Sequence, residues 1–118
     1  MDSVKILNIT IGEDNYPIQV PNYMLEEGES FFTKVDSDMD RGWQMSRRWV
    51  ENPDTVQRCQ ILADRMLTAI QTKNNPMVGL AAAYILSRLP GVEHIDMDTT
   101  GDITLTRFEV NGKSIPDN

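Results

Sequence analysis

One stretch in the second half of the chain is apolar on nearly every side, and it constrains the fold more than any other feature. Residues 77–89 (MVGLAAAYILSRL) follow Asn75-Pro76, in which asparagine can cap a helix and proline can occupy its first position. Pro90-Gly91 ends the stretch. A helix without a polar face must be covered on all sides, so we expect a central helix around which the rest of the chain packs.

A second helix is expected directly before this one. Asn52-Pro53 repeats the same start signal, and apolar residues then recur at spacings of three and four. The expected core stripe consists of Val56, Cys59, Leu62 or Ala63, Met66 and Ile70. The pair of helices would form the helical layer of the fold.

Two earlier segments also show helical spacing. Residues 23–34 are expected to form one helix, with Gly28 in its interior. Ser37 and Asp40 match a capping box, which predicts another helix over residues 37–50.

Both ends of the chain change to a period of two, which is typical of strands. Residues 4–11 are rich in β-branched side chains and lead through a cluster of turn formers into residues 16–20, so we expect a hairpin. Pro17 cannot donate to a ladder and predicts an edge strand. The apolar phase changes between Ile6 and Leu7, which indicates a bulge or a strand covered on both faces.

A second hairpin is expected from residues 92–98 and 103–110. Pairing Thr99 with Ile103 would place Ile95, Met97, Ile103 and Leu105 on one face. The prediction for the whole chain is therefore a single α+β domain over residues 1–118. Its two terminal hairpins would form one antiparallel sheet packed against three to four central helices.

The charge of the chain excludes several classes of partner. The formal charge is −7 and the sequence pI is about 4.5, which disfavours nucleic-acid backbones and anionic membrane surfaces. No apolar run is long enough to span a bilayer and no secretory signal is evident, so we expect a cytoplasmic protein. The single cysteine, Cys59, excludes an internal disulfide and, with one histidine, a Cys/His zinc site.

The negative charge is not evenly distributed along the sequence. Residues 1–40 carry −7, residues 41–88 carry +4 and residues 89–118 carry −4. The basic residues of the middle segment are Arg41, Arg47, Arg48, Arg58, Arg65, Lys73 and Arg88. They either pair with the acidic flanks inside the fold or form a positive face.

Two acidic groups could hold a divalent cation. His94, Asp96 and Asp98 alternate along a predicted strand and would share a face, either as metal ligands or as a solvated polar surface. The aspartates at positions 36, 38 and 40 resemble the start of a calcium loop, but their spacing to a later acid fails, and they also suit the first turn of a helix.

Cys59 and His94 could also form a nucleophile and base, although the place of Cys59 on a core stripe favours burial.

The most unusual segment contains two tryptophans and two adjacent arginines. Trp43 and Trp49 cannot both face one narrow helical stripe. Either the two pack against different neighbours, one against the sheet and one against another helix, or one of them is exposed beside Arg47 and Arg48. Tryptophan and arginine are the residues most enriched at interaction hot spots.

The sequence therefore predicts a small protein-interaction or regulatory domain without catalytic activity or cofactor, which binds a protein partner or a second copy as a homodimer. The alternatives are a metal-binding protein or metal-dependent enzyme using the histidine and aspartates, and an acidic mimic of nucleic acid.

Overall fold

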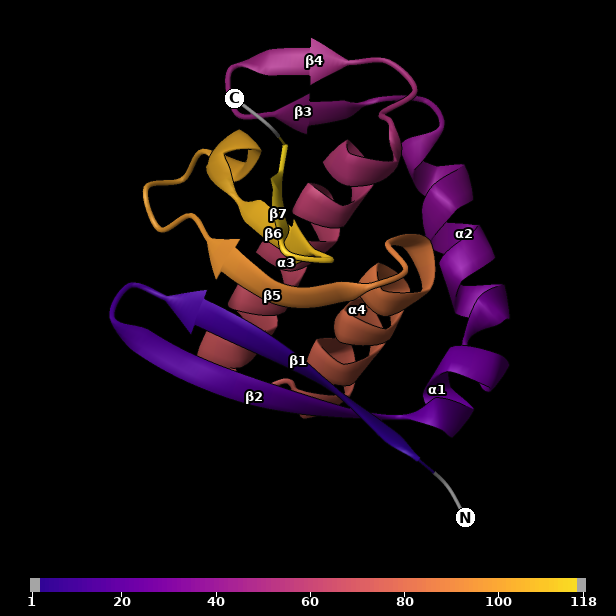
Figure 1. Ribbon diagram of the computed structural model, residues 1–118. Helices are drawn as coiled ribbons and strands as arrows, with labels where there is room; N and C mark the ends of the chain where they lie inside the picture. The colour runs from indigo at the N-terminus through magenta and orange to yellow at the C-terminus, as the bar shows by residue number, and fades with distance from the viewer. Residues whose placement is uncertain (1–2, 117–118) are drawn as a thin grey trace.

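The computed structural model describes residues 3–116 as a five-stranded sheet, a separate two-stranded sheet and four α-helices (Figure 1). The strands are β1 (Val4–Ile11), β2 (Asp14–Pro21), β3 (Trp43–Met45), β4 (Arg48–Val50), β5 (Val92–Met97), β6 (Arg107–Val110) and β7 (Lys113–Ile115). The helices are α1 (Asn22–Glu27), α2 (Glu29–Met39), α3 (Thr55–Gln71), α4 (Asn75–Arg88) and a short 3-10 helix, η1 (Ile103–Leu105). Within residues 3–116, no helix is both long and apolar enough to cross a membrane.

The larger sheet joins both ends of the chain, as expected, but it is mixed rather than antiparallel. Its strand order is β2-β1-β5-β6-β7. All neighbours are antiparallel except β1 and β5, which run parallel with Asn8 opposite His94. The reason is the long connection between these two strands: it contains all four α-helices, and a crossover of this length allows parallel pairing. The α+β class is confirmed, and the purely antiparallel sheet is wrong at this one pair.

The N-terminal hairpin agrees with its prediction in most respects. β1 and β2 pair without a register shift around a two-residue turn, and Pro17 lies in β2, which is an edge strand. Neither explanation for the change of apolar phase holds. The ladder contains no bulge, and Ile6 is simply exposed at 54%, whereas Leu7 is fully buried.

The C-terminal hairpin has a different register from the predicted one. β5 pairs with β6 so that Ile95 faces Phe108, and Ile103 is in η1 rather than in a strand. Two aspartates cause this difference. Asp98 accepts the backbone N–H of Thr100 and of Asp102, and Asp102 accepts the N–H of Thr104. Such local side-chain bonds compete with strand pairing.

The predicted helix over residues 37–50 is wrong. α2 ends at Met39, and the following residues form the β3–β4 hairpin at one end of the molecule (Figure 1). The predicted helix over residues 23–34 is divided at Gly28 into α1 and α2.

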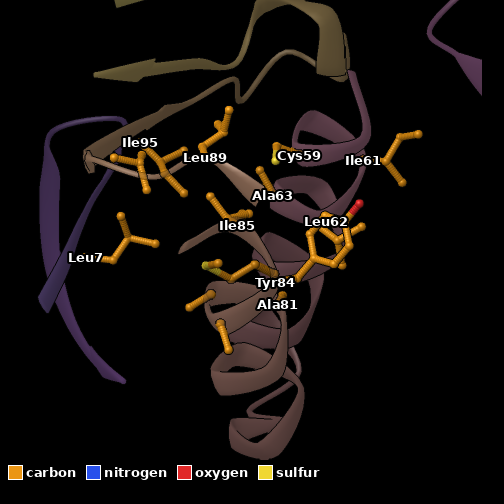
Figure 2. Close-up of a cluster of buried hydrophobic side chains, with 14 of the residues drawn as sticks. Leu7, Cys59, Ile61, Leu62, Ala63, Ala81, Tyr84, Ile85, Leu89 and Ile95 are labelled. Atoms are coloured by element: carbon orange, nitrogen blue, oxygen red, sulfur yellow. The ribbon is translucent and has the colours of Figure 1, made fainter. Parts of the chain in front are cut away.

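The two strongest predicted helices are present, with their first residues shifted. α3 begins after Asp54, which forms a capping box with Gln57, rather than after Asn52. α4 begins after Asn74, one residue earlier than expected. Both helices pack against one face of the five-stranded sheet, and their facing side chains form the core with those of β1 and β5 (Figure 2). Cys59 and Tyr84 lie within this core.

Candidate functional site

The β3–β4 hairpin places its two tryptophans on opposite faces. Met45 pairs with Arg48, and Gln44 pairs with Trp49. Because directly paired residues share a face and successive residues alternate, buried Met45 and half-buried Trp43 point toward the core, whereas Trp49 points outward. The exposed fraction of Trp49 is 54%. One tryptophan is thus exposed and the other packed because they lie on opposite faces of a hairpin, and not because they lie on different sides of the predicted helix.

The indole of Trp49 lies against the backbone of Gly42. A Cβ atom at Gly42 would lie 2.6 Å from the indole Nε1, so any side chain at this position would force the indole or the backbone to shift. Gly42 also has a φ of +115°, which favours glycine. The chain therefore holds this exposed aromatic ring against a backbone position that has no side chain.

A cleft of about 680 Å³ lies under the inner face of the hairpin. One wall comes from β3, β4 and their turn, and the opposite wall comes from the connection between β5 and β6. The lining residues are Met45, Ser46, Arg47, Arg48, Val50, Gln57, Thr100, Gly101, Asp102, Thr104 and Leu105. This volume lies within the range of small-molecule sites, and the lining combines two cations, several hydroxyl groups and the 54% exposed side chain of Leu105.

Asp102, on the opposite wall of the cleft, lies close to the hairpin turn. The hydroxyl of Thr104 donates to Asp102 at 2.5 Å and is the main cause that lowers the pKa of this carboxyl. The hydroxyl of Ser46 and the positive charge of Arg47 lower the pKa of Asp102 further. Asp102 therefore stays ionised, with one carboxylate oxygen used by Thr104.

The charge of Arg47 acts on Asp102, but the two arginines of the hairpin hold no close acidic partner in residues 3–116. Within residues 3–116, neither Arg47 nor Arg48 forms an ion pair. Guanidinium groups bind carboxylates in a bidentate manner. The arrangement can therefore bind an anionic group in the cleft, with apolar contact available from Leu105 on one side and Trp49 on the outer face.

Two other arginines of the basic middle segment are already paired inside the fold. Arg88 contacts Asp36 at 3.0 Å and Glu29 at 3.2 Å, and Arg58 contacts Asp40 at 2.8 Å. Asp36 also accepts a hydrogen bond from the hydroxyl of Tyr84. The structure thus places Arg58 and Arg88 in a paired group around Asp36, and Arg47 and Arg48 on the hairpin.

These contacts account for the first set of predicted metal ligands. The carboxylates at positions 36 and 40 bind arginines, and Asp38 is exposed on α2.

His94 and Asp96 of the second set share the outer face of β5, on either side of buried Ile95, but each of the three residues is engaged elsewhere. His94 Nε2 lies 2.6 Å from the hydroxyl of Thr10, Asp96 is paired with Arg107 of β6, and Asp98 binds N–H groups of its own loop. Among the residues that the structure describes, no group of three or more His, Cys, Asp or Glu side chains could hold a metal ion.

Cys59 and His94 lie on different sides of the sheet. Cys59 is fully buried in α3, where burial raises the pKa of its thiol, so the reactive thiolate is disfavoured. His94 alternates with buried Ile95 and therefore points to the face opposite the helices.

The wall formed by the β5–β6 connection could not be recognised from the sequence as part of the site. Asp98 and Asp102 each accept a hydrogen bond from the threonine two positions later, and this Asp-x-Thr spacing was the signal in the sequence for a structured loop.

Comparison with family models, with curated proteins and with solved structures gives no match for this chain.

Proposed function

We propose that the chain is a non-catalytic protein-interaction domain that binds an acidic segment of a partner protein through the β3–β4 hairpin. The observation that carries the proposal is the pair Arg47 and Arg48, two cations without an ion pair in residues 3–116, which line a cleft of about 680 Å³ while exposed Trp49 lies on the outer face of the same hairpin. Exposed tryptophan and arginine side chains of this kind dominate binding energy at interfaces. We also propose that the protein is cytoplasmic, because the free thiol of Cys59 is compatible with a reducing compartment.

The test compares variants of the hairpin with a matched change elsewhere. Trp49→Ala and the double variant Arg47→Glu/Arg48→Glu should each weaken binding of a captured and repurified partner at least about tenfold, the usual effect of removing a hot spot. Arg65→Glu makes the same kind of charge change at an exposed position on α3 and should bind like the unmodified chain.

Light scattering on the same proteins determines whether a second copy is the partner. A dimer that dissociates in the hairpin variants and not in Arg65→Glu would identify self-association through this surface. If all variants keep both the oligomeric state and partner binding of the unmodified chain, with an intact fold, the proposed function is wrong.

A further inference from the structure

The first half of β1 forms a strand edge that no strand within residues 3–116 covers. The pairing of β1 with β5 begins at Asn8, so residues 4–7 pair with β2 alone (Figure 1). Two apolar side chains stand on this part of the strand, Val4 with 48% and Ile6 with 54% of its surface exposed. Exposed apolar residues on an open edge are the features that allow another strand to add to a sheet.

The register shows which backbone groups face this open edge. Ile11 and Asp14 close the two-residue turn of the hairpin and form a hydrogen-bonded pair. Because hydrogen-bonded and non-hydrogen-bonded pairs alternate, the N–H and C=O groups of Val4 and Ile6 point away from β2. The edge therefore offers two donors and two acceptors beside two exposed apolar side chains.

The outer edge of β2, on the other side of this hairpin, is protected against pairing, unlike the edge of β1. The outward-pointing positions of β2 are Asn15, Pro17, Gln19 and Pro21, since each belongs to a non-hydrogen-bonded pair. The two prolines remove two of the four donors. Prolines on edge strands prevent unwanted pairing, so β1 retains an accessible edge beside one that is protected.

Lys5 determines what kind of strand this edge can accept. In the two-fold pairing of two copies that matches Val4 with Ile6 of the second copy, Lys5 would face the second Lys5 in the closer, non-hydrogen-bonded pair. Like charges directly opposite one another destabilise a sheet. Lys5 is exposed and has no ion pair among the described residues, so an acidic residue on the added strand would compensate its charge.

We propose that residues 4–7 of β1 bind an extended segment of a partner protein by strand addition, and that this segment carries an acidic residue opposite Lys5 between two apolar residues. The site is independent of the β3–β4 hairpin. Backbone hydrogen bonds at Val4 and Ile6 supply the contact, and the carboxylate opposite Lys5 supplies the selectivity.

The experiment titrates the isotopically labelled protein with two peptides and follows backbone amide signals by NMR. The first peptide, acetyl-Ser-Thr-Val-Glu-Val-Thr-Ser-amide, has the proposed pattern, and the second has lysine in place of its glutamate. We expect saturable shifts of the Val4 and Ile6 amides with the glutamate peptide and at least about threefold weaker binding of the lysine peptide. Lys5→Glu should reverse this preference, whereas Lys34→Glu, the same charge change on α2, should leave it unchanged.

Several results would overturn the proposal. The proposal is wrong if neither peptide moves the Val4 and Ile6 amides, or if the peptides shift the amides of Asn15 and Gln19 on β2 instead. It is also wrong if Lys5→Glu and the unmodified chain show the same preference between the two peptides. A third contradicting result would be that the protein alone shows these shifts with rising concentration, together with a doubled mass in light scattering, which would make a second copy the occupant. Binding at the hairpin affects none of these readouts, so the two proposals fail separately.

Discussion

Asp36 connects three helices through a single carboxylate. It lies on α2 and binds Arg58 of α3 at 3.4 Å, Arg88 of α4 at 3.0 Å and the hydroxyl of Tyr84. Arg88 also lies over the rings of Phe32 and Tyr84, at 5.6 and 5.3 Å from their centroids. Burial alone would raise the pKa of Asp36, but the hydrogen bonds from Tyr84 and Arg88 and the charge of Arg88 outweigh it and lower the pKa.

Asp36→Asn should therefore destabilise the protein considerably. We expect the free energy of unfolding to fall by about 2–4 kcal/mol at pH 7, because two arginines lose their shared counter-ion in a partly buried setting. A lowered pKa contributes stability above the ordinary carboxyl pKa of about 4, and this contribution is lost as the pH falls through the folded-state value. The difference between the variant and the unmodified chain should accordingly shrink in urea titrations at acidic pH.

Asp38→Asn is the matched control for this prediction. Asp38 lies on the same helix and is exposed, so its substitution should change the free energy of unfolding by no more than about 0.5 kcal/mol. Equal effects at positions 36 and 38 would show that the charge of α2, and not the pairing of Asp36, stabilises the fold.

At the scale of single residues, burial could be predicted from the sequence, but ion pairing could not. The burial of Cys59 follows from its helical spacing with other apolar residues, and the structure confirms it. The role of Asp36 does not follow in this way, because its partners Arg58 and Arg88 are 22 and 52 positions away. Only the tertiary arrangement of the helices brings these side chains together.

At the scale of elements, long segments with a strong start signal were predictable and short ones were not. α3 and α4 carry caps and a proline near their first residues, and both are present within a few residues of their predicted bounds. β3 and β4 have three residues each, too few to show alternation. Gly42, whose positive φ follows the end of α2, was the signal that could have ended the predicted helix there.

The end of α3 offers a test of element stability. The N–H groups of Lys73 and Asn74 donate to the carbonyls of Ile70 and Ala69, which is the Schellman pattern of a helix end. Lys73 has a φ of +59°, a conformation in which glycine is favoured. Lys73→Gly should raise the free energy of unfolding by about 0.5–1 kcal/mol, measured by urea unfolding.

The control for this change separates the backbone from the side chain. Lys73→Ala removes the charged side chain but keeps the Cβ atom, so it should give no such gain. If alanine stabilised the protein as much as glycine, the lysine side chain and not its backbone conformation would be the source of the strain.

For the whole molecule, the fold divides the basic residues in a way that the sequence left open. Pairing with the acidic flanks holds for Arg58 and Arg88, since α2 brings its carboxylates against α3 and α4. Arg47 and Arg48 are not paired in this way: they lie on the β3–β4 hairpin at the cleft, where neither forms an ion pair within residues 3–116. Segment charges could pose both possibilities, but only the packing of α2 and the position of the hairpin decide between them.

The core of the whole molecule should make it sensitive to alkaline pH. Cys59 and Tyr84 are almost fully buried, and burial raises the pKa of both groups. A raised pKa contributes stability below the unfolded-state value, about 8.5 for cysteine and 10 for tyrosine, and this stability is lost as the pH rises above it. Between about pH 8.5 and 10 the contribution of Cys59 to the free energy of unfolding should therefore fall by about 1.6 kcal/mol in all, with a slope that approaches about 1.4 kcal/mol per pH unit only toward pH 10.

Cys59→Ala isolates this contribution. The variant lacks the titrating thiol, so its free energy of unfolding should stay nearly constant until about pH 10, where the ionisation of Tyr84 in the unfolded chain begins to favour unfolding. Urea titrations under reducing conditions at several pH values measure both curves. If the free energy of unfolding declines equally in the two proteins between pH 8.5 and 10, the burial of Cys59 does not cause the loss of stability at alkaline pH. If only the unmodified chain loses stability in this range, a single core residue sets the upper pH limit of the fold.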